Sequence, residues 1–517
     1  MRELPAWVRR LSTRPAAALV ALLLGTYAYF YQAGGWNQNS RFDLVRAMVE
    51  DGALRTDRFA KNTGDDAVRR GHHYCDKAPG SSWLCAPTYA AFYWLSGAPK
   101  EYGPSWLGWA AWLSIVVAVS VPSAIAAVFL ARLARALGLE RWAQLAVALV
   151  WGLASLGLPY STLLYGNQLA ASFLLIGFTL LVEVRGGARP TAAAMLVAGG
   201  CLGLAGACEY PAALVMAPIA VYGLAVLGRR RAWAALGWAA VGGAIPLAAL
   251  AVYHARAFGS PGAFPYDFSV WKEPHVGFMG IGVPKWPAIR GTFVGEHRGL
   301  LYAMPWIVLA VPGAVVLARR SWAEVAVCAW AVIAFVWLNV SIKPWHGGWA
   351  TGPRYVVPML PFLVVLCGGV LGWVRRPRDV AAGWRRAAMA AAIVVGLGAA
   401  GWSAAHMFAA TVVKPEITEK ELRPYHHVVW PNFRRGRFSI STQSIDMRGN
   451  PDRAPRQAWN LGMKAGLDGH ASLVPLYLWW ILCALWLRRA WFGVPAPADA
   501  PADALAAEPG PDIPTAS

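Results

Sequence analysis

Long apolar runs separated by short basic stretches set the pattern of this chain. A membrane-spanning helix needs about 20 mostly apolar residues. The pattern therefore predicts an all-α polytopic membrane protein with about twelve transmembrane helices. The predicted spans lie near 16–33, 105–131, 142–159, 165–182, 191–208, 211–228, 232–254, 299–318, 322–341, 353–374, 387–411 and 471–487.

A thirteenth run, residues 81–97, is shorter and carries Ser, Thr, Pro and Tyr. Without it, and with the N-terminus inside, the seven short cytoplasmic segments hold 21 arginines against four acidic residues. Cytoplasmic loops carry such an excess of basic residues, so this arrangement is favoured. We therefore expect 81–97 to lie at the membrane surface or to dip into it, both termini to be cytoplasmic, and 16–33 to act as a retained signal anchor.

The remaining polar sequence divides the chain into regions. We expect a transmembrane module over 1–411 that includes a first outer loop at 34–104, then a basic outer loop or small subdomain over 412–470. A last transmembrane helix over 471–493 and a disordered cytoplasmic tail over 494–517 complete the chain. Shorter outer segments are expected at 255–298 and 342–352.

Two outer segments have a local pattern of their own. Phe42, Val45 and Val49 recur at helical spacing, which predicts an amphipathic helix over 40–51 on the outer face, with Ser40 as its N-cap. Residues 438–446 read as a short strand, which would make a small accessory subdomain in the last outer loop.

Composition excludes several classes of protein. The chain is 57% hydrophobic and 14% charged, whereas a soluble protein has about 25% charged residues. The net charge of +20 would suit a nucleic-acid binder, but not beside so many apolar runs, so no nucleic acid is expected as a partner. The 28 tryptophans fit membrane-interface belts. Seven cysteines without a CxxC motif indicate no zinc ribbon, and Cys75 and Cys85 either pair or stay free.

Three polar clusters are candidates for chemistry at the outer level. Charged loops are usually solvated, but Gly and Pro around residues 62–80 suggest a defined turn. A lysine beside the bilayer suits a lipid phosphate, an arginine can clamp one with two bonds, and an acid near the membrane is a functional candidate. The acids considered are Asp43, Asp65 and Asp76; the phosphate-binding candidates are Lys77, Arg298 and Arg354; the cavity candidates are His72, His73, Tyr74, Asn167, Glu209 and His346.

Four stretches together resemble the GT-C superfamily, which includes protein O-mannosyltransferases and lipid A aminoarabinose transferases. SRFDLVRAMVEDGAL resembles their DExRYxxxxxxM helix, and YCDKAPG at 74–80 resembles their YFEKPP turn. YGNQLAASFLL at 165–175 and WHGGWATGPRYVVPMLPFL at 345–363 resemble further segments of these proteins. The motifs are scattered over most of the chain, and their order and outer placement carry the resemblance.

The resemblance implies an inverting glycosyltransferase in a bacterial-type inner membrane, with its active site on the extracytoplasmic face. Its partners would be a polyprenyl-phosphate-linked sugar, membrane lipids and an acceptor hydroxyl on a glycan, lipid or protein. By motif match Lys77 would hold the phosphate. One departure stands out, because Gln38 and Asn39 occupy the positions of the family's acidic pair, and an amide cannot act as a base.

Another acid must then take that role if the chain is catalytic. Asp43 ranks first, one helical turn from Asn39, followed by Asp65; Asp76 matches the turn acid of the family and is expected to orient Lys77 if it is not the base. The alternatives are a non-catalytic polyprenyl-phosphate binder or flippase and a secondary transporter. No cofactor is expected to be required, although His72, His73 and Asp76 leave a divalent metal as an alternative.

Overall fold

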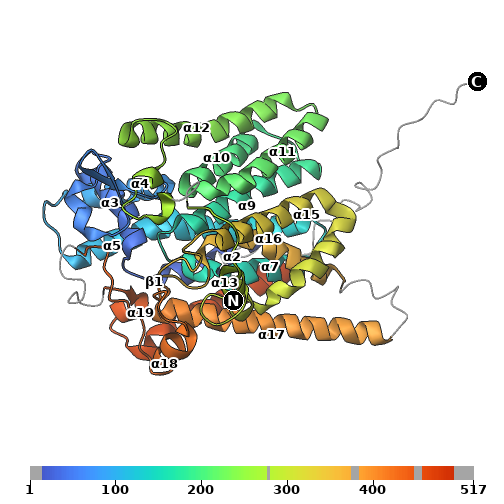
Figure 1. The fold of residues 1–517 in the computed structure, drawn as a ribbon. Coiled ribbons are helices and arrows are strands. Elements are labelled where there is room, and N and C mark those ends of the chain that lie inside the picture. The colour runs from blue at the N-terminus through green and yellow to red at the C-terminus, as the bar shows by residue number, and fades with distance from the viewer. Residues whose placement is uncertain (1–13, 276–279, 374–382, 448–456, 494–517) are drawn as a thin grey trace, which may run out of the picture.

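The computed structural model describes residues 14–275, 280–373, 383–447 and 457–493, and almost all of its regular structure is helical. The apolar runs form the main helices, whose packing Figure 1 shows. These are α2 (Pro15–Ala28), α5 (Pro104–Ile115), α6 (Val121–Ala136), α7 (Arg141–Leu153), α8 (Gly157–Tyr160), α9 (Gly166–Arg185), α10 (Ala192–Cys208), α11 (Ala213–Arg229), α12 (Trp233–Phe258), α15 (Ala310–Ser341), α16 (Leu360–Gly368), α17 (Gly383–Val413) and α20 (Val474–Phe492).

Eight helices of the described chain are long and apolar enough to cross a membrane, and α2 and α10 are shorter apolar helices. The prediction of an all-α polytopic membrane protein is confirmed, whereas the number twelve stays a prediction. The counts differ partly because Pro305–Ser341 is one helical stretch where the sequence predicts two spans. Ser321 breaks this stretch with φ −141° and ψ 50°, next to the predicted boundary.

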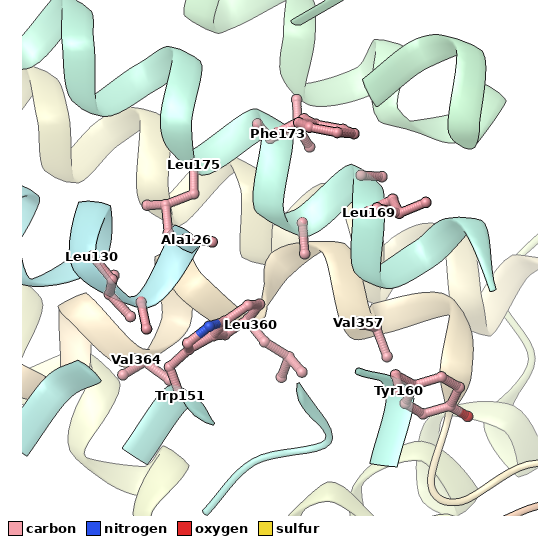
Figure 2. Packing of buried hydrophobic residues seen from close by; sticks show 14 of the residues in the cluster. Ala126, Leu130, Trp151, Tyr160, Leu169, Phe173, Leu175, Val357, Leu360 and Val364 are labelled. Atoms are coloured by element: carbon pink, nitrogen blue, oxygen red, sulfur yellow. The ribbon is translucent and has the colours of Figure 1, made fainter. Parts of the chain in front are cut away.

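Close packing of buried side chains holds the central helices together. Figure 2 shows Leu130 of α6 and Trp151 of α7 meeting Leu360 and Val364 of α16, with Leu169 and Phe173 of α9 above them. Between membrane helices this packing stabilises through van der Waals contact, because lipid tails are as apolar as the side chains themselves. Tyr160 lies at the end of this core nearest the site described below.

The first loop folds against one end of the bundle (Figure 1). It contains α3 (Trp36–Glu50), η1 (Asp57–Asn62), the antiparallel hairpin β2 (Asp66–Arg69) and β3 (His72–Cys75), and α4 (Gly80–Leu95). The predicted 81–97 helix is therefore present as α4, and it is not among the eight candidate spans.

The predicted helix over 40–51 is present, but it starts earlier than expected. Its N-cap is Gly35, so the prediction of Ser40 as the cap is wrong. Ser40 lies inside the helix and cannot cap it. Its hydroxyl instead donates a hydrogen bond to Asp76 at 3.2 Å. The side chains from Asn37 to Ala47 are all buried, because neighbouring loops cover the polar face that the sequence pattern left open to solvent.

The last loop lies beside the first one. Strand β1 (Phe30–Tyr31) pairs antiparallel with β4 (Trp459–Asn460), and η9 (Tyr425–Val429), α18 (Trp430–Arg434) and α19 (Leu461–Lys464) complete this region (Figure 1). Residues 438–446 form no strand, since their backbone bonds go to side chains and to the end of α17. Residues 1–13 and the tail predicted over 494–517 lie outside the described residues.

Short helical segments connect the longer helices from residue 209 onwards. They are η3 (Tyr210–Ala212), η4 (Pro265–Phe268), η5 (Glu273–His275), α13 (Trp286–Phe293), α14 (Leu300–Ala303), η6 (Pro305–Leu309), η7 (Arg354–Met359), η8 (Gly369–Trp373) and η10 (Gly469–Leu473). A π-helical turn, η2 (Val116–Ser120), joins α5 to α6. All seven cysteines are free thiols, so Cys75 and Cys85 are not paired.

Candidate functional site

Charged side chains from distant parts of the chain gather where the first and last loops meet the bundle. We call this set the ionic cluster, and it contains four carboxylates and three cations. Its members are Arg41, Asp65, Asp76, Lys77, Glu209, Arg354 and Glu416. Six of them were candidates or lay in motifs of the sequence, whereas Glu416 was not considered.

The Lys77 ammonium lies between the carboxylates of Asp65 and Asp76. Its Nζ is 3.0 Å from Asp65 and 2.8 Å from Asp76, and its side chain is 13% exposed. Burial alone would raise the pKa of Asp65, but Lys77 and then Arg354 hold it below its usual value. Burial raises the pKa of Asp76, which shares the same ammonium. Lys77 is thus charged and already paired, which limits how strongly it can attract a further anion.

Arg41 and Glu209 form a second pair, with 3.6 Å between NH2 and Oε2. The Arg41 NH1 also donates to Ser81 at 2.8 Å and to the carbonyl of Ala78. Glu209 lies against the first turn of α9, where a Cβ on Gly166 would come within 2.7 Å of its Oε2. A carboxylate at a helix N-terminus is favoured by the helix dipole, while burial raises its pKa.

Arg354 is the cation of the cluster that has no carboxylate partner among the described residues. Its NH1 donates to the Tyr165 hydroxyl at 3.4 Å and its NH2 to the Tyr355 hydroxyl at 3.3 Å. Its charge acts on Asp65, Glu209 and Glu416 from beyond ion-pair distance. Gly347 packs on its aliphatic stem: φ is +75°, and a Cβ there would lie 2.9 Å from Arg354 Cγ. The two-glycine motif therefore fixes where the guanidinium lies.

Glu416 reaches the cluster from the loop after α17. Its Oε2 accepts a hydrogen bond from Gln38 Nε2 at 2.8 Å, and its Oε1 accepts one from the Tyr165 hydroxyl at 2.7 Å. The residue is 3% exposed. Burial raises its pKa to about 7, although Tyr165, Lys414, Arg354 and Gln38 act in the opposite direction.

Arg298 has a different environment from Arg354. It is 1% exposed, and its guanidinium donates to the carbonyl oxygens of His346, Gly348, Ile417 and its neighbour His297 at 2.8–3.2 Å. These bonds tie the glycine loop to the loop that carries Glu416. A small adjacent pocket is lined by Arg298, Thr351, Ile417 and Tyr425, among others.

The first-choice acid of the sequence analysis, Asp43, lies one turn along α3 in a neighbouring network. Its Oδ1 accepts from Asn62 Nδ2 at 2.8 Å, and the Arg46 guanidinium is 3.8 Å away. The Nδ2 of Asn39 donates to the carbonyls of Asn62 and Ser444, so this amide ties loops together.

The histidines of the first loop lie on the β2–β3 hairpin. His72 bonds Asp57 at 2.9 Å and His73 bonds Asp66; their side chains are 45% and 36% exposed. The Tyr74 ring packs against Phe258, with centroids 5.4 Å apart. No interaction within the described chain joins these three side chains to Arg354 or Lys77.

The remaining cavity candidates are His346 and Asn167. His346 Nδ1 accepts from the amide of Gly348 at 3.1 Å, and burial followed by the Arg298 charge lowers its pKa. Asn167 follows Gly166 in the first turn of α9 and is buried. Within the described ranges, no three His, Cys, Asp or Glu side chains are grouped so as to hold a metal ion.

This arrangement combines an unpaired cation with carboxylates in a site shielded from water. Arg354 can bind an anion such as phosphate with two N–H groups, because a guanidinium fork matches phosphate oxygens. A carboxylate whose pKa lies near neutrality can accept a proton at the pH of the cell. A reaction that transfers a group from a phosphate to a hydroxyl requires both: a cation for the departing phosphate and a base for the hydroxyl proton.

Comparisons with known proteins find a loose likeness of fold. No protein-family model and no curated protein match the chain. ArnT from Cupriavidus metallidurans, solved with undecaprenyl phosphate, is 17% identical with a TM-score of 0.41, over 94% of this chain and 77% of ArnT. The oligosaccharyltransferase AglB from Archaeoglobus fulgidus, solved with an inhibitory peptide and a dolichol-phosphate, is 12% identical with a TM-score of 0.46.

The alignment with AglB covers 78% of this chain and only 56% of AglB. An apo structure of the Archaeoglobus fulgidus enzyme is 14% identical, with a TM-score of 0.47 over 79% of this chain and 56% of that one. ArnT and AglB are GT-C membrane glycosyltransferases, the superfamily that the sequence motifs resemble. The TM-scores of these three structures are all below 0.5, so this likeness carries no argument about function.

Proposed function

We propose that this integral membrane protein transfers a sugar from a polyprenyl-phosphate donor to an acceptor hydroxyl. The observation that carries the proposal is Arg354, a cation that Gly347 and two tyrosine hydroxyls hold in place and that pairs with no carboxylate in the part of the chain that the structure describes. The guanidinium of an Arg so placed suits a phosphodiester, whose leaving group gains a negative charge as the sugar departs. The motif resemblance supports the same reaction.

In this proposal Arg354 binds the donor phosphate and Lys77 adds a positive charge from the side of the first loop. The pairing of Lys77 with Asp65 and Asp76 gives it a mainly orienting part, since two carboxylates already offset its charge. Arg298 acts as a positioning residue, because its guanidinium is bonded to carbonyls of both loops that frame the site. Removing it would displace the glycine loop rather than a direct phosphate contact.

We further propose that the site faces the extracytoplasmic side of a bacterial-type inner membrane, with both termini in the cytoplasm. The arginine-rich short segments support this orientation. Cysteines introduced singly at Glu421 and at Arg230 test it in intact cells with a membrane-impermeant maleimide. Labelling is expected at position 421 and not at position 230, and the reverse pattern would overturn the orientation.

The activity is tested with the purified full chain in lipid nanodiscs. Undecaprenyl phosphates carrying mannose, glucose or 4-amino-4-deoxyarabinose are offered with membrane glycan, lipid and protein acceptors, and release of undecaprenyl phosphate is measured. At least one donor is expected to be consumed, with loss of turnover in Arg354→Ala. Binding of undecaprenyl phosphate without any transfer would instead identify a lipid binder, and absence of binding would overturn the proposal altogether.

A further inference from the structure

The amide at position 38 directly contacts a carboxylate that is remote in the sequence. Gln38 stands where the resembling family has an acid, and its Nε2 donates to Glu416, 378 residues away. The same side chain uses its Oε1 to accept from the backbone N–H of Leu164 at 2.9 Å. Both ends of the Gln38 amide are thus occupied, and its orientation is determined by these two bonds.

We propose that Glu416 is the general base of the proposed transferase, taking over from the last loop the role that the first loop lacks. This inference rests on the proposed function. The position of the carboxylate supports it, because Gly35 at the N-cap of α3 leaves room for it: a Cβ on Gly35 would lie 3.0 and 3.1 Å from the two Glu416 oxygens. The carboxylate therefore occupies the space at the start of α3 beside position 38.

Glu416 is also connected to the phosphate-binding candidate. Tyr165 donates to Glu416 Oε1 at 2.7 Å, and Arg354 NH1 lies 3.4 Å from the same hydroxyl. The Arg354 guanidinium therefore lies within two hydrogen-bond lengths of the carboxylate, and a phosphate that it binds would lie within three. Because a general base must lie within about 3 Å of the hydroxyl whose proton it takes, the acceptor hydroxyl would lie beside Glu416 and the donor phosphate beside Arg354.

The other acids of the cluster are less suited to this task. Asp65 and Asp76 share the Lys77 ammonium, which lowers the pKa of Asp65 and occupies an oxygen of each carboxylate, although burial raises the pKa of Asp76. Glu209 is paired with Arg41. Glu416 accepts bonds from two neutral groups, and an ionised carboxylate has about four acceptor sites, so capacity remains for a substrate hydroxyl.

The step balances in atoms and charge. The acceptor hydroxyl gives its proton to the Glu416 carboxylate as its oxygen bonds to the anomeric carbon, and the bond from that carbon to the phosphate oxygen breaks with its electron pair. Polyprenyl phosphate leaves with one more negative charge, next to Arg354, and Glu416 becomes neutral. The charged groups around Glu416 are Lys414 and Arg354, with Tyr165 as the neighbouring titratable hydroxyl, and burial places its titration near pH 7.

The test compares Glu416→Gln with Glu421→Gln, an acid five residues along the same loop that bonds His427. Turnover of the active donor is measured from pH 5 to 9 in nanodiscs, and undecaprenyl phosphate affinity is measured separately. Glu416→Gln is expected to lower kcat by roughly 10²–10⁴-fold, to leave affinity within about threefold of wild type, and to remove the acidic limb near pH 7. Glu421→Gln is expected to match wild type.

A second measurement needs no turnover. Infrared difference spectra of the protein between pH 5 and 9 are expected to contain a protonated-carboxyl band that titrates near pH 7 and is missing from Glu416→Gln. If Glu416→Gln keeps full turnover while Asp43→Asn, Asp65→Asn or Asp76→Asn abolishes it, the base lies in the first loop and Glu416 is not the base, with the transferase intact. If the wild type transfers no sugar, the proposed function fails and the role of Glu416 falls with it.

Discussion

Two adjacent glycines allow the phosphate-binding role of Arg354 to be tested without touching the arginine itself. Gly347 and Gly348 both have left-handed backbone, with φ of +75° and +66°. An alanine at either position costs about 1–2 kcal/mol of backbone strain. Only at Gly347 does the new methyl meet Arg354, 2.9 Å from Cγ and 3.3 Å from Cδ; at Gly348 nothing lies within 4 Å.

The two substitutions should therefore differ in ligand binding more than in stability. Atoms at 2.9 Å from a Cβ must move, and Arg354 is expected to swing its guanidinium away from Tyr165 and Tyr355. A hydrogen bond to a charged group contributes about 1.5–3 kcal/mol. Losing the Arg354 bond to phosphate should then weaken undecaprenyl phosphate binding by about ten- to hundredfold, since 1.4 kcal/mol corresponds to tenfold.

The assay is equilibrium binding of undecaprenyl phosphate to each variant in nanodiscs, with thermal unfolding recorded on the same samples. Both variants are expected to lose similar stability, while only Gly347→Ala loses affinity. Wild-type affinity in both variants would refute the assignment of Arg354 to the phosphate. An equal loss in both would show that the loop, and not the arginine, sets binding.

Three further outcomes follow from the charged groups. Lys77→Met leaves Asp65 and Asp76 side by side without a counter-charge, so thermal unfolding should reveal a loss of about 3–5 kcal/mol, partly recovered in Lys77→Met/Asp65→Asn. Arg298→Ala should lower thermal stability and turnover together, whereas unchanged stability with weaker lipid binding would show direct phosphate contact. The Glu416 pKa is raised in the folded state, so its contribution to stability is present below about pH 4.5 and is lost as pH rises towards 7; wild type should lose stability relative to Glu416→Gln over that range, and parallel curves would contradict it.

The apolar pattern predicted the helices well, because a membrane span is encoded locally in about 20 consecutive residues. The Ser321 break coincides with Arg319 and Arg320, the basic pair that separates two predicted spans. Helix α3 was predicted from Phe42, Val45 and Val49, but its true start was missed. A glycine cap with no side chain to signal it, five residues before Ser40, leaves no pattern in the sequence.

The site was predicted only in part, for reasons of distance along the chain. Lys77, Asp65 and Asp76 lie close together in sequence, so their grouping was visible, whereas Glu416 meets Gln38 only through the fold. The signal that was available is the pair of facts that position 38 lacks an acid and that a Glu follows Lys414-Pro415 just past an apolar run. Nothing in one sequence states that these two facts belong together.

The contacts between the two ends of the chain have a consequence for biosynthesis. The β1–β4 ladder pairs Phe30 with Asn460, and Gln38 bonds Glu416. The first loop therefore leaves the ribosome long before the C-terminal segments that it contacts. Contacts of such sequence separation form late. The first loop must therefore remain without its covering segments, with Gln38 lacking Glu416 and Asn39 lacking the Ser444 carbonyl, until nearly the whole chain has been inserted. During biosynthesis, membrane proteases and chaperones would therefore encounter a nearly complete helix bundle in which the site has not yet been assembled.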